Sequence, residues 1–221
     1  MVPDWRFDLM GLSHSPRIVT DGLVLCLDAA NKRSYPGAGT TWTDLTANKN
    51  NGTLTNMTNN FSTDGAGSLT FDGTDEYVDL GSQVANLSTL TISFWINYNT
   101  FPSNNSPIGY DTNPYDYVVL FQNGNMYFRA GGSYVGHTHN TVNTGVWYNF
   151  VVTKGSTYIR MYQNNKLLGQ SGTVATNINV EWIGRGYVYD DAKISLVHVY
   201  NRELSANEVQ QNYLATKGRY A

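Results

Sequence analysis

The chain has little charge, a single cysteine and no long apolar run. Only 14% of its 221 residues are charged, the net charge is -3, and lysine and arginine never form a run. Without a basic patch the sequence offers no electrostatic footprint for nucleic acid or an anionic membrane, so we expect neither as a partner. No apolar stretch approaches the roughly 20 residues of a membrane span, and none near the start has the form of a secretion signal.

Cys26 is the only cysteine, which excludes an intramolecular disulfide. Its position between Leu25 and Leu27 predicts a buried structural thiol rather than a reactive one. The scarcity of charge is accompanied by 16 tyrosines and by many asparagines, threonines and glycines. Neutral polar side chains must therefore cover much of the surface, a composition that suits extracellular and virion proteins.

The length allows one all-β sandwich with a large core, so we predict a single domain at residues 21–221. Residues 1–20 show no clean hydrophobic period and are predicted to form an N-terminal arm. Two interpretations of this arm stay open: it packs on its own sandwich, or it docks on a neighbouring subunit. The docking residues would be its apolar side chains, Trp5, Phe7, Leu9 and Met10.

Short segments with strand-like patterns follow the arm. Residues 22–28 are almost continuously apolar, which predicts a strand covered on both faces and central to its sheet. Residues 68–72 and 76–80 alternate around a Gly-Thr-Asp turn and predict two short strands. The alternation in residues 90–97 places one set of side chains on a core face: Leu90, Ile92, Phe94 and Ile96.

Two segments have the composition of loops. Residues 31–60 are rich in Asn, Thr and Gly, and predict a long ordered loop with a short strand at 52–55. Residues 98–115 contain three of the six prolines, Pro102, Pro107 and Pro114, and predict a loop rather than a strand.

The second half of the chain shows a hairpin, further strands and one helix. Asn123-Gly124 between residues 117–122 and 126–130 is a strong hairpin signal. Residues 146–153, 158–167 and 183–185 predict a strand, a hairpin and another strand. Ser205 and Glu208 form a capping box at the start of a helix of about 12 residues. We expect Val209, Tyr213 and Leu214 on one side of this helix, and Gly218 as its stop.

The order of these segments resembles the laminin-G-like, concanavalin-A-like jelly-roll family. The resemblance rests on residues 22–28, 50–54, 69–73, 90–95, and 199–205 with the following helix. It implies an antiparallel two-sheet jelly-roll sandwich with one short C-terminal helix. The sequences of residues 22–36 and 211–220 are also similar to those of this family's members among the structural proteins of tailed bacteriophages. The resemblance thus implies a non-catalytic protein at the virion surface, for capsid decoration or associated with the tail.

Members of this family often hold a structural calcium ion, which takes six to eight oxygen ligands. Here the early loop keeps Asp44 and several asparagines but places Lys49 among them, and Ser195 stands where the family pattern has an aspartate. A lost carboxylate and a gained cation both weaken such a site. We therefore expect no metal or other cofactor, and expect the loop asparagines to bond their own backbone instead.

The sequence does not favour catalysis. Glycosidases of this fold need two carboxylates facing the substrate, and the motif Glu-x-Asp-x-x-Glu is absent. His137 and His139 have metal-site spacing, but two imidazoles without a nearby carboxylate or cysteine leave a zinc shell incomplete. We predict that the protein is not an enzyme; a glycoside hydrolase remains a minor alternative because the fold permits it.

Sugar binding needs aromatic faces that stack on pyranose rings and polar groups that orient hydroxyls. Such side chains could converge at one rim of the sandwich, although tyrosines also pack half-buried on sheet faces. The candidate carbohydrate-binding residues are Tyr110, Asp111, Asn113, Tyr115, Tyr134, His137, Arg185, Tyr187 and Tyr189.

The partners expected are other virion subunits and cell-surface glycans. A free-standing lectin, with or without calcium, is the alternative to the virion protein. A homo-oligomer stays open, because no residue pattern identifies an interface.

Overall fold

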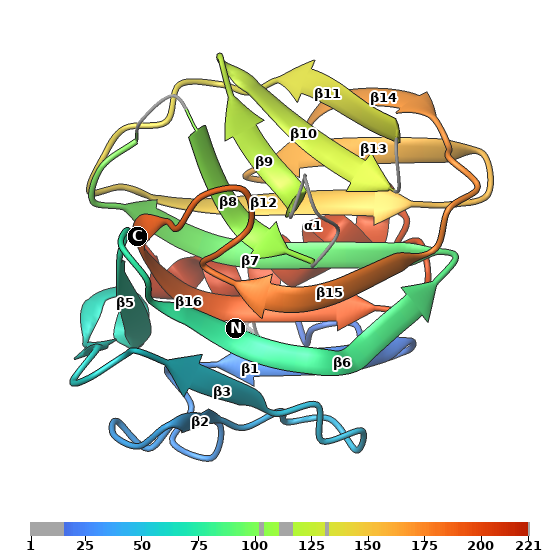
Figure 1. The fold of residues 1–221 in the computed structure, drawn as a ribbon. Helices are drawn as coiled ribbons and strands as arrows, with labels where there is room; N and C mark the ends of the chain where they lie inside the picture. The colour runs from blue at the N-terminus through green and yellow to red at the C-terminus, as the bar shows by residue number, and fades with distance from the viewer. Residues whose placement is uncertain (1–15, 102–103, 111–116, 131–132, 221) are drawn as a thin grey trace, which may run out of the picture.

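Two antiparallel sheets pack face to face in the computed structural model, which describes residues 16–101, 104–110, 117–130 and 133–220 (Figure 1). Sheet A runs β14 (Lys166–Gly172), β13 (Tyr158–Gln163), β12 (Trp147–Lys154), β7 (Leu90–Tyr98), β16 (Asp191–Tyr200), β5 (Ser68–Asp72) and β4 (Phe61–Ser62), with β1 (Leu23–Asp28) also paired to β16. Sheet B runs β11 (Ser133–Thr138), β10 (Asn125–Ala130), β9 (Tyr117–Gln122), β8 (Asn104–Gly109), β15 (Ile178–Ile183), β6 (Tyr77–Leu87), β3 (Gly52–Thr55) and β2 (Thr41–Trp42). The predicted antiparallel two-sheet sandwich is confirmed.

The core lies between the two sheets and follows the period of two that strands impose. Leu90, Ile92, Phe94 and Ile96 of β7 all face it, as their alternation predicts, and each is no more than 1% exposed. The hairpin of β9 and β10 is also confirmed. Its turn uses Asn123 and Gly124 with φ of 50° and 76°, the left-handed values that a two-residue hairpin turn requires.

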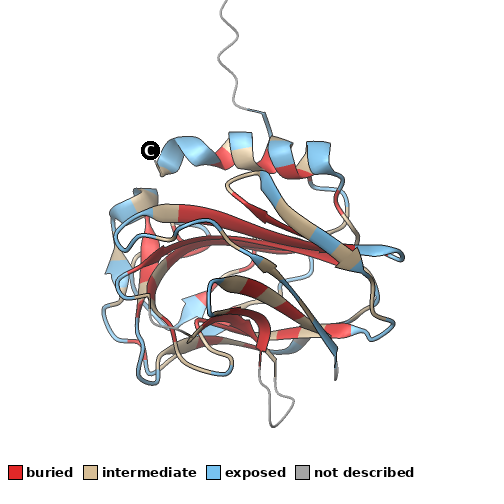
Figure 2. Ribbon diagram, turned by 90° about the horizontal axis from the view of Figure 1, so that it is seen from above, coloured by how far each residue is buried: buried red, intermediate tan, exposed pale blue. Residues whose placement is uncertain are grey.

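The outer face of sheet A is covered by α1 (Ala206–Thr216), which crosses it as one layer (Figure 2). The capping box is confirmed, because the Ser205 hydroxyl accepts from the Glu208 N–H while the Glu208 carboxylate accepts from the Ser205 N–H. Beneath the helix lies a second apolar cluster made of Val19, Val151, Tyr162, Tyr200, Leu204 and Val209. Within the described residues no helix is long and apolar enough to cross a bilayer.

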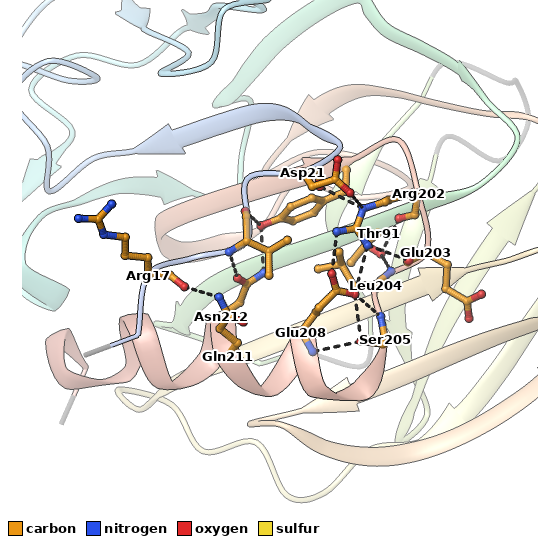
Figure 3. Close-up of polar contacts among 12 residues, drawn as sticks. Arg17, Asp21, Thr91, Arg202, Glu203, Leu204, Ser205, Glu208, Gln211 and Asn212 are labelled. Atoms are coloured by element: carbon orange, nitrogen blue, oxygen red, sulfur yellow. Dashed lines mark hydrogen bonds and ion pairs between the residues drawn. The ribbon is translucent and has the colours of Figure 1, made fainter. Parts of the chain in front are cut away.

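The described end of the predicted arm lies against this helix (Figure 3). The Val19 N–H donates to Asn212 Oδ1 at 2.8 Å, and the Val19 carbonyl accepts from the Tyr200 hydroxyl at 2.9 Å. The Gln211 side chain donates to the Arg17 carbonyl at 2.7 Å. Residues 17–19 are therefore bonded to the sandwich, whereas Trp5, Phe7, Leu9 and Met10 lie outside the described residues.

The predicted position of β1 is wrong in one respect. Residues 25–28 are buried as expected, but β1 pairs only with β16 among the described strands and so lies at an edge rather than in the centre. The early loop protects its free edge: Asp44 Oδ1 accepts from the Cys26 N–H at 2.9 Å, and Leu45 donates its N–H to the Cys26 carbonyl. A strand covered by a loop and a helix therefore has the same run of apolar residues in its sequence as a strand in the centre of a sheet.

The prediction of a loop at residues 98–115 is also wrong, because β8 (Asn104–Gly109) is a strand in the middle of sheet B. Pro107 falls where the pairing with β9 shifts register, between Asn105 and Ile108. The missing N–H of a proline is tolerated at such an irregularity. Its carbonyl accepts from the Gly184 N–H at 2.9 Å, which helps to hold the chain after β15.

Two further expectations need correction. The strands at residues 68–72 and 76–80 exist as β5 and the first part of β6, but they belong to different sheets and do not form a hairpin. On α1, Leu214 is 38% exposed, whereas Asn212 and Thr216 are buried because they hydrogen-bond Val19 and Trp95. The helix ends at Thr216, and Gly218 lies inside a following 3-10 turn, η2 (Lys217–Arg219).

Candidate functional site

The outer face of sheet B carries a band of aromatic side chains. On β9 and β10, Leu120 pairs with Tyr127 on the face opposite to the core residue Phe121. Arg129 pairs in turn with Tyr134 of β11. Because α1 packs on sheet A, no helix of the described chain covers this face (Figure 2).

The loop at residues 184–190, between β15 and β16, lies on the same face. Its chain folds back on itself through a bridge between Arg185 and Tyr189, and the Asp190 N–H donates to the Gly184 carbonyl at 2.9 Å. A Cβ at position 109 would collide with the Arg185 carbonyl oxygen, so only glycine lets the loop approach β8 this closely. Gly109 therefore allows the loop to pack closely on the sheet.

Three rings surround the guanidinium of Arg185. Its Cζ lies 3.9 Å from the Trp182 ring centroid, 4.8 Å from that of Tyr77 and 5.5 Å from that of Tyr189. We call these four residues the Arg185 cluster. Arginine over an aromatic face is attracted by the ring quadrupole. No carboxylate within the described ranges forms an ion pair with Arg185, so its N–H donors stay available.

The middle of the band is a shallow pocket of about 130 Å³ lined by Tyr117, Leu120, Gln122 and Tyr187. Tyr187, at the tip of the loop, is 52% exposed. Arg129 of β10 lies over the Tyr117 ring, 5.6 Å from its centroid. The loop and the β9–β10 hairpin thus form one continuous surface.

The far end of the band is formed by Tyr127 and Tyr134, whose rings meet edge to face at 5.7 Å. A Cβ at position 136 would collide with the Tyr127 ring, so Gly136 leaves the space that this ring occupies. Tyr134 is 63% exposed. An exposed ring held by a neighbouring ring is a suitable stacking platform.

The structure brings together only part of the predicted sugar site. Arg185, Tyr187, Tyr189 and Tyr134 share the outer face of sheet B. His137 lies on the opposite face of β11, where its Nε2 is 3.1 Å from Ser171 Oγ of β14. Tyr110 is half-buried against the core, and Asp111, Asn113 and Tyr115 lie outside the described residues.

Sequence reasoning missed Tyr77, Tyr117, Tyr127 and Trp182. Tyr77 precedes the core residue Val78, and Tyr127 stands between the core residues Met126 and Phe128. Because side chains alternate between the two faces of a strand, the core residues on either side could have predicted that these tyrosines face outward.

The groups expected in a metal site are used otherwise. The Asp44 carboxylate accepts backbone N–H groups of Cys26, Thr46 and Asn50, which organises the early loop. Ser195 donates to the Gly67 carbonyl at 2.7 Å. His139 bonds the Asn140 carbonyl, and no group of three metal-binding side chains occurs in the described part of the chain. The expectation that no calcium binds stays a prediction.

Cys26 and Asp190 are among the buried ionisable groups whose pKa values are shifted. Burial raises the pKa of the Cys26 thiol to about 12, which confirms a buried thiol that stays protonated. Burial raises the pKa of Asp190 to about 7, even though its Oδ1 accepts from the Ser106 N–H at 2.6 Å. This hydrogen bond attaches Asp190, at the end of the loop with the Arg185 cluster, to β8.

The fold is that of a jelly-roll sandwich. Residues 72–210 match the laminin G-like model of the concanavalin A-like lectin/glucanases superfamily, and this match covers more than half of the chain. The chain belongs to that superfamily, as its sequence pattern predicts. No curated protein sequence matches it.

Solved structures with a similar fold include a Trypanosoma rangeli sialidase in complex with the inhibitor DANA, with a TM-score of 0.68 and 15% identity over 95% of this chain and 36% of that one. The binding domain of Paraclostridial Mosquitocidal Protein 1 aligns with a TM-score of 0.63 and 14% identity over 87% of this chain and 52% of that one. The ligand binding domain of botulinum neurotoxin serotype D, in complex with N-acetylneuraminic acid, aligns with a TM-score of 0.59 and 16% identity over 87% and 50%. The chain spans about a third to a half of these structures, and the likeness shows the fold.

Proposed function

We propose that this chain is a non-catalytic carbohydrate-binding protein that recognises cell-surface glycans through the outer face of sheet B. The observation that carries the proposal is the Arg185 cluster, in which a guanidinium without a carboxylate partner in the described chain is held among three rings. Tyr187 and Tyr134, both more than half exposed, extend this surface across the sheet.

The chemistry of this face suits a sugar. Exposed tyrosine rings offer flat apolar faces to the C–H groups of a pyranose, and burying them on binding gains hydrophobic free energy. The guanidinium of Arg185 offers several fixed N–H donors that can orient hydroxyl or acid oxygens. Because the rings around Arg185 hold it in place, ordering it costs little on binding.

Proteins of similar fold support this proposal. The structure of the botulinum neurotoxin serotype D domain contains N-acetylneuraminic acid, and a structure of the Trypanosoma rangeli sialidase contains sialic acid. Binding of cell-surface glycans by this chain is consistent with both. A free-standing lectin and a lectin mounted on a particle would use the same face.

The non-catalytic part of the proposal is supported by the use of three of the four glutamates in internal contacts. Glu203 pairs with Arg160, and Glu208 forms two hydrogen bonds with Arg202 besides capping α1. Glu76 accepts from the Asn60 side chain and the Asp72 N–H. A glycosidase needs two carboxylates free to face a substrate. A glycoside hydrolase is therefore the minor alternative.

The same proposal places the protein at the surface of a bacteriophage particle, on the capsid or the tail, with other virion subunits as partners. Its support is the resemblance of residues 22–36 and 211–220 to phage structural proteins. Deleting residues 1–15, which leaves the bonds of Arg17 and Val19 to α1 intact, should abolish particle incorporation and leave the fold unchanged. Normal incorporation of the truncated protein would refute a docking role for the arm.

A glycan array with the full-length protein tests the proposed function, run once with calcium and once with chelator. We expect specific binding in both conditions, and we expect Arg185→Met and Tyr187→Ala to remove it. Tyr158→Ala is the matched control, because Tyr158 is 40% exposed and lies under Arg160 at 5.0 Å, but belongs to β13 of sheet A. Loss of binding in the control alone, or an array silent in both conditions, would overturn the proposal.

A further inference from the structure

A second pocket, of about 400 Å³, opens on the other side of the molecule, where α1 ends over the outer face of sheet A. This volume lies within the range of small-molecule sites. The side chains that line it come from β7, β12, the turn between β13 and β14, and the end of the chain: Trp95, Trp147, Asn164, Tyr213, Lys217 and Tyr220.

The rings of this pocket form a stacked set. Trp95 stacks on Tyr220 at 4.0 Å between centroids and 17° between planes, and on Tyr213 at 5.7 Å and 14°. Trp147 lies 5.1 Å from Tyr220 at 46°. Trp95 is only 4% exposed and forms the floor, whereas Trp147, Tyr213 and Tyr220 are half-buried and present parts of their surfaces to the opening.

Hydrogen bonds fix two of these rings, Trp95 and Tyr220, in position. The Trp95 indole N–H donates to Thr216 Oγ1 at 3.0 Å, and the Tyr220 hydroxyl donates to Ser195 Oγ at 2.9 Å. Gly65 allows the close approach, because a Cβ there would meet the rings of Trp147 and Tyr220 at under 3 Å. The pocket is thus formed before any ligand arrives, which lowers the entropic cost of binding.

Two polar groups of the pocket, the Asn164 side-chain NH₂ and the Lys217 ammonium, are donors without an acceptor partner in the described chain. The Asn164 Oδ1 accepts a hydrogen bond from the Asn149 N–H at 2.8 Å, and the side-chain NH₂ of Asn164 has no partner within the described residues. The Lys217 ammonium lies 5.9 Å from the Tyr213 centroid and forms no ion pair with any described carboxylate. Among the described residues, no aspartate or glutamate lines the pocket.

We propose that this pocket is a second binding site, which takes a sugar ring bearing an acid group. The aromatic walls stack on the apolar face of the ring, and the ammonium of Lys217 with the amide of Asn164 receives the carboxylate or sulfate. A neutral sugar would gain no ion pair with Lys217, whose side chain is exposed. The site is independent of the outer face of sheet B and does not rest on the function proposed for that face.

One NMR titration separates the two sites. The chain has five tryptophans, and the indole N–H of Trp147 reports on this pocket while that of Trp182 reports on the Arg185 cluster. ¹⁵N-labelled full-length protein is titrated with glucuronic acid and, in parallel, with glucose. Trp147→Phe assigns the pocket signal. We expect glucuronic acid to shift the Trp147 signal saturably, with an affinity at least about five-fold higher than that of glucose.

Charge variants test the role of Lys217. Lys217→Gln should remove the preference for the acid, Lys217→Arg should retain it, and Lys32→Gln, an exposed lysine of the early loop, should leave it unchanged. Equal affinity for the two sugars, an unchanged preference in Lys217→Gln, or a Trp147 signal that does not move at millimolar sugar would each overturn the proposal. A shift of the Trp182 signal alone would support the function proposed for sheet B and refute the second site.

Discussion

The outer faces of the two sheets are built in different ways. Sheet A is covered by α1 and by the chain around Val19, and the contact is made by buried apolar side chains together with the Asn212 and Tyr200 hydrogen bonds. Sheet B carries an aromatic band that no helix of the described chain covers. The polar groups directly beneath α1 bond one another. Arg185 on sheet B, like Lys217 beyond the end of α1, contacts aromatic rings but has no ion partner within the described ranges. Surface saturated by its own chain stabilises the fold, and surface left unsaturated is available to a ligand.

The largest expected effect concerns Asp190, which ties the sheet B loop to β8. Burial raises its pKa from 3.8 to about 7, so the folded protein holds the proton more tightly than the unfolded chain does. The stabilising contribution is complete below about pH 4 and is lost as the pH rises through about 7, which corresponds to about 4 kcal/mol at most. Asp190→Asn should raise the free energy of unfolding at pH 8 and change it little at pH 4, as measured by urea titration.

His198 is another buried group whose titration changes the stability in this pH range, and comparison with the wild type controls for it. Burial lowers the pKa of His198 to about 4, so its contribution has the opposite sign and is lost as the pH falls from about 6.5 through 4. Both proteins contain His198, and the difference between them isolates Asp190. A difference that does not depend on pH would show that Asp190 is not protonated in the folded protein.

On the sheet A side, the largest loss should come from Arg219→Met. Arg219 donates twice to the Asp28 carboxylate, at 2.8 and 2.9 Å, and Asp28 is 5% exposed. Removing the cation leaves a buried charge without its partner, at a cost of about 3 kcal/mol in chemical unfolding. Combining it with Asp28→Asn should recover most of the loss. A double variant as unstable as the single one would contradict this explanation.

A smaller loss is expected from Asn212→Leu, which tests whether the cover over sheet A depends on its hydrogen bonds. The substitution leaves the Val19 N–H without its acceptor in a buried position, which should cost about 2 kcal/mol. The substitution should accelerate hydrogen exchange at the Val19 amide at least as much as it raises the equilibrium constant of global unfolding. An exchange rate equal to that of the wild type would mean that residues 17–19 are held by packing alone.

The smallest effect belongs to the helix start. Ser205→Ala removes the side chain that accepts the Glu208 N–H and should lower the free energy of unfolding by about 1 kcal/mol. Leu214→Ser, at an exposed position of the same helix, should change it by less than about 0.5 kcal/mol. Thermal unfolding of both variants distinguishes the cap from the exposed face. The reverse order would contradict the assignment of the buried face.

How far the sequence predicts this molecule depends on the range of the interaction concerned. Alternation placed Phe94 in the core, and the capping box placed Ser205 at the start of α1, because both signals lie within a few residues. Pro107 misled the prediction, since a register shift set by β9 makes room for a proline inside a strand. Leu214 misled it as well, because hydrogen bonds to Val19 and Trp95, far away in sequence, turn Asn212 and Thr216 inward.

The candidate site shows the same limit. Arg185, Tyr187 and Tyr189 are close in sequence and were found together. Tyr77 joins them only because β6 pairs with β15, and Tyr117 only because β8 places β9 near the loop. A site made of neighbouring strands needs the strand order, and no local pattern contains it.

The edge position of β1 has a consequence for synthesis on the ribosome. Leu25 pairs with Val199, so β1 leaves the exit tunnel long before the strand that completes it. Until β16 emerges, an apolar strand with unpaired backbone groups is exposed in the nascent chain, which is the form of segment that associates with other chains. Productive folding must wait for β16, more than 160 residues after β1, and non-local closure of this kind slows folding. A chain truncated before β16 should therefore aggregate rather than form a smaller sandwich.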